Sequence, residues 1–343
     1  MPPREPKSVF DERASRGSRR LESGVGSGPR VLRRLRGEPA ARRIAATSEE
    51  GYIEVPGGRV WYRSVGAGSG VPLLCLHGGP GFPHDYLEDL EGLGDRRRVV
   101  FYDQLGCGRS DRPHDESLWE IDRFVEELAL VRESLALERL HLYGSSWGGM
   151  LAMQYVLDRR PPLESLVLAS SPASCPRWTE DCAELIAELP ESVRETIRRH
   201  DTHRYTRCLE YSAAILPFYK RHVCRLDPWP DGLERSFAGA NPDISEYMAG
   251  PSEFAIVGTL RDWDVTDRLG EIRVPTLITC GEYDEFRPAH AEDMQRRIPN
   301  AELEVFSGAS HVTMAEVPDA YRARLDEFFD RVERGYPSST PPV

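Results

Sequence analysis

The chain has 343 residues, of which 40% are hydrophobic, 29% are charged and 9% are aromatic. This composition is typical of a globular protein with a sizeable core, and it excludes a collagen, a coiled coil and a wholly disordered chain. The formal net charge is −12, which argues against general nucleic-acid binding because contacts with phosphates need a cationic surface.

The charge is distributed unevenly along the chain. Residues 1–48 carry twelve Lys and Arg against five Asp and Glu, a net charge of +7, so the remaining residues carry −19. This segment is poor in large apolar residues and cannot bury enough surface to offset the entropy that ordering removes. We therefore predict a disordered basic extension over 1–48. The alternatives are a transit peptide, which its acidic residues weaken, and a tether to an anionic surface.

Several features that the sequence lacks indicate where in the cell the protein is located. There is no membrane-spanning apolar run of roughly 18 residues, and the first 25 residues hold no apolar stretch typical of a secretory signal. The seven cysteines are scattered and form no CxxC pair, which indicates reduced thiols rather than a zinc site or a disulfide framework. We expect a cytoplasmic protein that makes no contact with a membrane.

From about residue 50 onward, short apolar runs alternate with helical patterns. The runs predict strands, and apolar residues spaced three and four apart predict helices. The expected strands are 51–56, 59–65, 71–76, 98–102, 140–143, 165–169, 276–280 and 303–306, and the expected helices are 121–137, 147–157 and about 316–333. This alternation implies βαβ units and the α/β class, with a mostly parallel sheet of eight strands flanked by helices.

The alternation stops between about residues 172 and 262. This stretch holds amphipathic helical pieces, at 182–189 and 193–200, but no strong strand. Ligands of open α/β sheets bind beyond the carboxyl ends of the strands, so a helical insertion at that end would act as a lid. We predict a core over 49–171 and 263–335, a helical cap over 172–262 and a flexible tail over 336–343.

The motif GSSWGG at 144–149 fits the pattern G-x-S-x-G around Ser146. It follows a predicted strand and opens a predicted helix, which is the context of a nucleophile elbow. The glycines permit a sharp turn that projects the Ser146 hydroxyl, and the N-terminus of the helix favours developing negative charge. The structural alternative is a strand-to-helix turn that is merely packed by glycines.

The loop HGGPG at 77–81 follows the third predicted strand. In a hydrolase with a nucleophile elbow, this loop supplies one backbone N–H of the oxyanion hole and the residue after the nucleophile supplies the other. We predict Gly79 and Trp147 as these donors, each typically contributing ~10²–10³ in rate. His77 is expected to be a structural hydrogen-bonding residue rather than a base.

A serine nucleophile needs a basic histidine and a carboxylate, which follow it in the order Ser, acid, His in this fold. Only His290 and His311 come after the predicted cap. His311 lies in a loop of small residues between the last strand and the last helix, so we predict it as the base. His290 lies in an amphipathic segment and is expected to be an exposed helix residue.

The acid should follow the penultimate strand, where CGEYDE at 280–285 offers three carboxylates. We predict Asp284 as the acid, with Glu282 and Glu285 as alternatives. Elsewhere, Arg109 and Asp111 are expected to form a local ion pair, and Cys107 is expected to be inert.

Seven stretches together resemble the proline iminopeptidase family of α/β hydrolases, in the branch that includes the tricorn-interacting aminopeptidase. They are LHGGPG (76–81), YDQLGCGRS (102–110), GSSWGG (144–149), GPSEF (250–254), RDWDVTD (261–267), PTLITCGEYDE (275–285) and SHVTM (310–314). The resemblance implies the α/β-hydrolase fold and a serine aminopeptidase that releases the N-terminal residue of short peptides through an acyl-enzyme.

By this resemblance, Ser146, Asp284 and His311 would form the triad, and Glu253 and Glu285 would bind the free α-ammonium of the substrate. That amino group is largely protonated near neutral pH, with a pKa of about 7.7–8.0, and a desolvated cation must be paired. We expect no metal and no organic cofactor, and we expect the partners to be short peptides or aminoacyl amides with a free N-terminus.

Two other functions stay open at this point. An amino-acid amidase or an esterase could use the same scaffold, and a non-catalytic receptor for a small ligand could keep all three triad residues. The sequence indicates neither the preferred first residue of the substrate nor the oligomeric state.

Overall fold

The computed structural model describes residues 48–203, 205–252 and 254–335. The predicted basic extension lies outside these residues apart from Ser48, and so does the predicted tail over 336–343. Glu253 is also outside the described residues.

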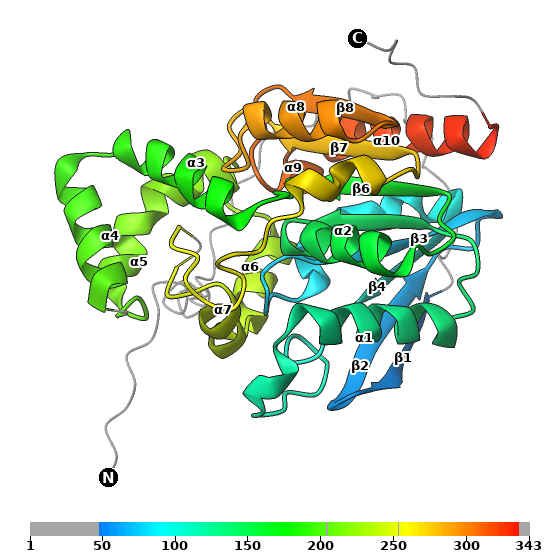
Figure 1. Cartoon of the computed structure of the whole chain (residues 1–343), viewed down its shortest axis with the longest axis horizontal. Helices are drawn as coiled ribbons and strands as arrows, with labels where there is room; N and C mark the ends of the chain where they lie inside the picture. The colour runs from blue at the N-terminus through cyan, green and yellow to red at the C-terminus, as the bar shows by residue number, and fades with distance from the viewer. Residues whose placement is uncertain (1–47, 204, 253, 336–343) are drawn as a thin grey trace, which may run out of the picture.

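An eight-stranded sheet forms the centre of the protein, in the order β1-β2-β4-β3-β5-β6-β7-β8 (Figure 1). The strands are β1 (Ser48–Val55), β2 (Gly58–Val65), β3 (Gly70–Leu76), β4 (Arg97–Tyr102), β5 (His141–Ser145), β6 (Ser165–Ala169), β7 (Thr276–Gly281) and β8 (Ala301–Phe306). The pairs β1–β2 and β2–β4 are antiparallel, whereas the other five pairs are parallel. The prediction of a mostly parallel α/β sheet is confirmed.

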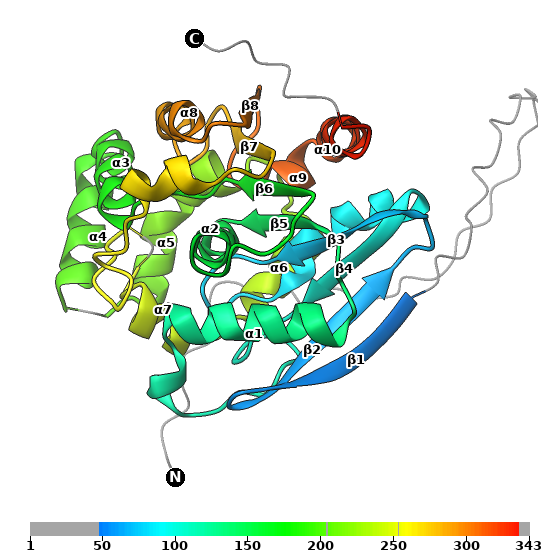
Figure 2. The same ribbon diagram turned by 45° about the vertical axis from the view of Figure 1, so that its right-hand side comes forward.

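Helices cover both faces of the sheet, which explains why the central strands are nearly continuous apolar runs. On one face, α1 (Ile121–Ser134), α2 (Trp147–Arg159) and α8 (Pro288–Arg297) pack on side chains such as Leu74 and Leu76 of β3. On the other face, the 3-10 helix η2 (His84–Asp95) and α10 (Pro318–Glu333) pack on the alternate side chains, Leu73 and Cys75. Figure 2 shows α1 and α2 across the sheet from α10. None of the described helices is both long and apolar enough to cross a membrane.

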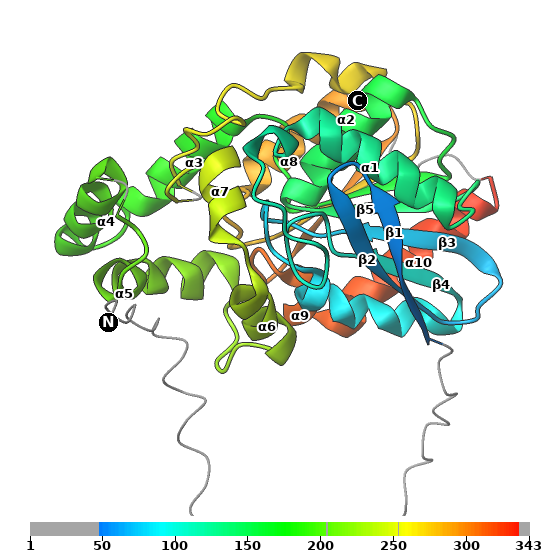
Figure 3. The same ribbon diagram turned by 90° about the horizontal axis from the view of Figure 1, so that it is seen from below.

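Between β6 and β7, the described part of the chain forms a group of helices that we call the cap helices. They are α3 (Cys175–Ala187), α4 (Glu191–His203), α5 (Leu209–Phe218), the π-helical segment η4 (Tyr219–Val223), α6 (Asp231–Gly239) and α7 (Pro242–Met248). They gather beside one end of the sheet (Figures 1 and 3). Local sequence starts several of them: the Ser174 hydroxyl caps α3, and the Asn241 side chain caps α7. The boundaries between core and cap stay a prediction.

Candidate active site

Ser146 stands at the turn between β5 and α2. Its φ of 55° and ψ of −123° lie outside the regions that residues other than glycine usually adopt. The turn is tight because a Cβ on Gly144 would lie 2.4 Å from the carbonyl oxygen of Gly148, and a Cβ on Gly148 would lie 2.3 Å from that of Leu76. The surrounding strands therefore hold Ser146 in a strained conformation, as they do at many functional sites.

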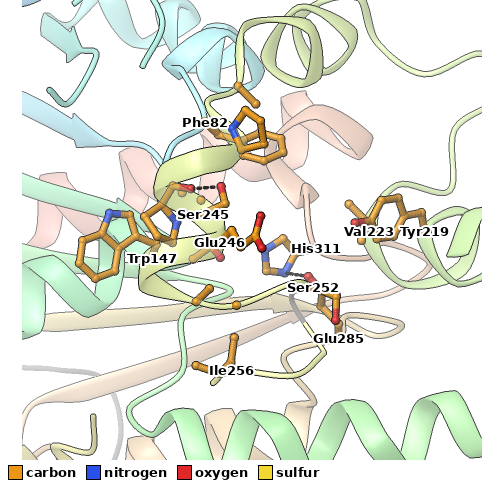
Figure 4. Close-up of a pocket in the computed structure, with 18 of the residues that line it drawn as sticks. Phe82, Trp147, Tyr219, Val223, Ser245, Glu246, Ser252, Ile256, Glu285 and His311 are labelled. Atoms are coloured by element: carbon orange, nitrogen blue, oxygen red, sulfur yellow. Dashed lines mark hydrogen bonds and ion pairs between the residues drawn. The ribbon is translucent and has the colours of Figure 1, made fainter. Parts of the chain in front are cut away.

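Ser146 lines a cavity of about 410 Å³ that lies where the cap helices meet this end of the sheet. His311 and Glu285 line the same cavity (Figure 4). Much of the remaining wall is apolar and comes from the cap helices, from the residue after the HGGPG loop and from the segment after α7, including Phe82, Trp178, Tyr211, Ile215, Tyr219, Phe237 and Ile256. The fold thus brings the predicted nucleophile and the predicted base to one cavity.

His311 is hydrogen-bonded to Asp284, with 2.8 Å between Nδ1 and Oδ1. Asp284 is only 2% exposed, and its carboxylate also accepts hydrogen bonds from the N–H groups of Phe286 at 2.8 Å and of Gly281 at 3.4 Å. An ionised carboxylate only accepts, so Nδ1 of His311 carries the proton and Nε2 is left to act as a base.

The two glutamates near Asp284 differ in where they lie. Glu282 is exposed, and its carboxylate accepts hydrogen bonds of 2.9 Å from the Gly308 N–H and the Ser307 hydroxyl, which lower its pKa. Glu285 is 2% exposed and lines the cavity, and its Oε1 lies 3.6 Å from Nδ1 of His311. The structure therefore brings Glu285, but not Glu282, to the cavity.

The two predicted oxyanion donors, Gly79 and Trp147, also line the cavity. Gly79 has a φ of +118°, a conformation that favours glycine. Trp147 is the first residue of α2, where a backbone N–H has no acceptor within the helix. In the described part of the chain, neither N–H donates to a backbone carbonyl. The loop lies against the nucleophile, since a Cβ on Gly78 would be 3.0 Å from Cβ of Ser146.

The expectation that His290 is exposed is wrong. His290 is on α8 but is only 4% exposed, and its Nδ1 lies 3.2 Å from Oδ2 of Asp181 on the cap helix α3. An amphipathic pattern separates the apolar face of a helix from its polar face. It does not reveal that another part of the chain covers the polar face.

The expected ion pair between Arg109 and Asp111 is also wrong. Asp111 pairs with Arg59 and Arg109 pairs with Glu50, each with 3.1 Å between the charged atoms. The β1–β2 hairpin lies against this loop and offers each residue a partner closer than its neighbour in sequence. By contrast, Cys107 is buried, which raises the pKa of its thiol and agrees with the expectation that it is inert.

Some residues that contact the site residues were missed in the sequence because their contacts are long-range. The ring of Trp178 on α3 packs edge-on against that of His311, with 6.0 Å between centroids. The backbone carbonyl of His222 in η4 accepts a hydrogen bond of 3.1 Å from the backbone N–H of His311. The Nδ1 of His222 donates to the Tyr283 carbonyl at 2.7 Å. No local pattern marks either residue, because only the docking of the cap brings them to the base.

A metal site is not evident in the residues that the structure describes, which hold no group of three or more His, Cys, Asp or Glu side chains placed to bind a metal ion.

Comparisons with known proteins agree on one family. A model of the alpha/beta hydrolase fold matches residues 71–318. The proline iminopeptidase of Heyndrickxia coagulans is 41% identical over 285 residues, covering 82% of this chain and 99% of the relative. That of Thermoplasma volcanium is 39% identical over 287 residues, covering 82% and 97%.

Two solved structures extend the likeness to three dimensions. The crystal structure of VinJ is similar with a TM-score of 0.80 and 37% identity, covering 83% of this chain and 99% of that one. The proline iminopeptidase of Mycobacterium smegmatis has a TM-score of 0.76 and 35% identity, covering 84% and 99%. The chain therefore belongs to the proline iminopeptidase family of α/β hydrolases.

Proposed function

We propose that the protein is a serine aminopeptidase that releases the N-terminal residue of short peptides. The main support is that one cavity is lined by Ser146, by the hydrogen-bonded His311 and by the buried carboxylate of Glu285. Membership of a family whose similar members are named proline iminopeptidases supports the same reaction.

The reaction begins with attack of the Ser146 hydroxyl on the first carbonyl carbon of the substrate. Nε2 of His311 takes the hydroxyl proton, and Asp284 stabilises the resulting imidazolium and holds its orientation. The N–H groups of Gly79 and Trp147 donate to the oxyanion of the tetrahedral intermediate. His311 then protonates the departing amine, and a water molecule that it activates releases the amino acid from Ser146.

The carboxylate of Glu285 binds the α-ammonium of the first residue. Glu285 is only 2% exposed and lines the cavity, and a protonated amine in such a desolvated place is stabilised by a charge-assisted hydrogen bond to a carboxylate. Glu253 was predicted as a second carboxylate for this cation and lies outside the described residues, so its role stays part of the proposal. An anchored ammonium limits the enzyme to the first residue, because only one carbonyl then reaches Ser146.

The reaction requires no metal or organic cofactor, and the cytoplasmic location stays a prediction. An amidase or esterase on this scaffold would use the same triad, so the nature of the leaving group is what distinguishes them.

The test is a panel of aminoacyl anilides that differ only in the first residue, each with a free amine and with an N-acetyl group. We expect turnover of the free-amine substrates by the wild type, at least about tenfold slower cleavage of the acetylated ones, and none above background by Ser146→Ala. Peptides and amino-acid esters in the same assay separate a peptidase from an esterase. Equal cleavage of free and acetylated substrates would contradict the ammonium anchor, and retained activity in Ser146→Ala would contradict the serine mechanism.

A further inference from the structure

Gln104 lies directly behind the two segments that carry the oxyanion donors. It is 2% exposed. Its Oε1 accepts a hydrogen bond of 2.8 Å from the indole Nε1–H of Trp147, and its Nε2 donates to the carbonyl oxygen of His77 at 3.0 Å. A single buried amide therefore joins the first residue of α2 to the HGGPG loop.

The backbone N–H of Gln104 determines which tautomer the His77 ring adopts. Its N–H donates to Nε2 of His77 at 2.9 Å, so this nitrogen must be unprotonated. The ring proton is then on Nδ1, which donates to the Gly78 carbonyl at 2.9 Å. Burial lowers the pKa of His77 to about 4, so the ring keeps this neutral form at neutral pH.

Anchoring the Gly78 carbonyl also orients the Gly79 N–H, because both belong to one peptide group. Neither of the two cis peptide bonds in the described residues joins Gly78 to Gly79. In a trans peptide the carbonyl and the N–H point in opposite directions. A carbonyl held on the His77 side therefore leaves the N–H on the other side, available to an oxyanion.

We propose that Gln104 is a positioning residue for the oxyanion hole, which it acts on through His77 on one side and Trp147 on the other. This inference rests on the proposed function. Without the amide, the Trp147 indole and the His77 carbonyl lose their buried partner and the two donors can move relative to each other. Misplacement of catalytic groups by about 1 Å can cost on the order of 100-fold in rate.

The molecule contains a matched control for this hydrogen bond. Oε1 of Gln154 on α2 accepts from the indole Nε1–H of Trp263, also at 2.8 Å. Neither of these residues lines the cavity. Gln154→Met thus removes the same type of bond at another point of the same helix, away from Gly79 and Trp147.

The experiment compares wild type, Gln104→Met and Gln154→Met on the aminoacyl anilide that wild type cleaves fastest. Two inhibitors are used: the boronic-acid analogue of that residue, whose adduct with Ser146 places a hydroxyl at the oxyanion position, and the free amino acid, which resembles the product. We expect Gln104→Met to lower kcat and the affinity for the boronic acid by about 10- to 100-fold. KM and the affinity for the amino acid should change less than about threefold, and Gln154→Met should stay within about twofold throughout.

Trp147→Phe keeps the backbone donor but removes the indole N–H, so it tests the same link if Gln104→Met does not fold. Trp147→Phe should lower the same quantities as Gln104→Met. In the variant that carries both substitutions, the fold-loss in kcat should be smaller than the product of the two single fold-losses. Equal loss of affinity for the boronic acid and the amino acid, or a kcat within about threefold of wild type in the folded variants, would overturn the inference. If the wild-type enzyme did not act through Ser146, the proposed function itself would be contradicted, and this outcome does not depend on the result for the Gln104 variant.

Discussion

The carboxyl end and the amino end of the sheet each bring together a serine, a histidine and a carboxylate. The carboxyl-end set consists of Ser146, His311 and Asp284. The amino-end set consists of Ser165, His141 and Glu333, with 2.7 Å from His141 Nδ1 to the serine oxygen and 3.0 Å from Nε2 to Oε1 of the glutamate. Judged by residue type alone, both sets have the composition of a triad.

Their surroundings are different. In the amino-end set, Ser165 and His141 are neighbours on regular strands, and both are 0% exposed. The His141 ring stacks on Phe329, with 4.2 Å between centroids, and Glu333 also pairs with the buried Arg97 at 2.6 Å. A substrate therefore cannot reach Ser165 or His141, since both are fully buried. The comparison teaches that access, a strained turn at the serine and nearby candidate oxyanion donors distinguish the proposed nucleophile from a serine that is buried in the fold.

The largest expected effect separates the two serines. Ser146→Ala should lower kcat/KM on aminoacyl anilides by roughly 10⁴-fold or more, because it removes the nucleophile. Ser165→Ala should stay within about threefold of wild type, because Ser165 does not contact the substrate. If the two folded variants lost kcat/KM to a comparable extent, the proposal that only Ser146 is the nucleophile would be contradicted.

Substitution of the carboxylate in each set should affect a different property: activity for Asp284 and stability for Glu333. Asp284→Asn should lower kcat by about 10⁴-fold, because it favours the wrong tautomer of His311. Glu333→Gln should leave kcat within about threefold but lower the free energy of unfolding by about 1–3 kcal/mol, since Arg97 loses a charged partner in a buried place. Steady-state kinetics and urea denaturation of both variants measure the two quantities, and a Glu333 variant that loses activity but not stability would contradict this assignment.

The carboxyl end of the sheet also differs from the amino end in having a second carboxylate, that of Glu285, which lines the cavity. Substitution of Glu285 tests whether this carboxylate binds the substrate. Glu285→Gln should lower kcat/KM for free-amine substrates by about 10- to 100-fold, because it removes a charge that pairs with the ammonium. The ratio of activity on free to acetylated substrates should fall with it. Glu282→Gln is the control from the same loop, since that carboxylate is exposed and bonds to Gly308 and Ser307. Equal effects of the two substitutions would contradict an ammonium site at Glu285.

The last expected effect is on the stability of the fold at low pH rather than on activity. Burial lowers the pKa of His141 from 6.5 to about 4. As the pH falls below about 6.5, the unfolded chain therefore binds this proton before the folded protein does. Stability is lost progressively from there down to about pH 4, by on the order of 3 kcal/mol for this group.

Urea midpoints of wild type and His141→Gln at pH 7 and pH 4.5 measure this contribution. The variant should lose less stability on acidification than the wild type, because it lacks the titrating ring. Identical losses would show that His141 does not carry this part of the pH dependence.

The strands, the flanking helices α1, α2 and α10 and the strained turn follow from local patterns, whereas η2 was not predicted. Apolar runs predicted the eight strands in their places along the chain, and G-x-S-x-G between a strand and a helix predicted the turn at Ser146. Such features are readable because backbone conformation depends mainly on residues close in sequence. The chain order of the fold also pointed to His311 and to three carboxylates at 280–285, of which the structure finds Asp284 2.8 Å from His311.

Other features depend on how distant segments pack. CGEYDE does not reveal that Glu285 lies in the cavity and Glu282 in solvent, and nothing near His290 indicates that the cap covers it. The glutamine in YDQLGCGRS looks like a loop residue until β4 places it behind both oxyanion segments. Local sequence determined which residues form strands, helices and turns, whereas the docking of the cap and the sheet decided their partners. The physical reason is that burial and hydrogen bonding depend on neighbours in space, and most of those neighbours are far away in the chain.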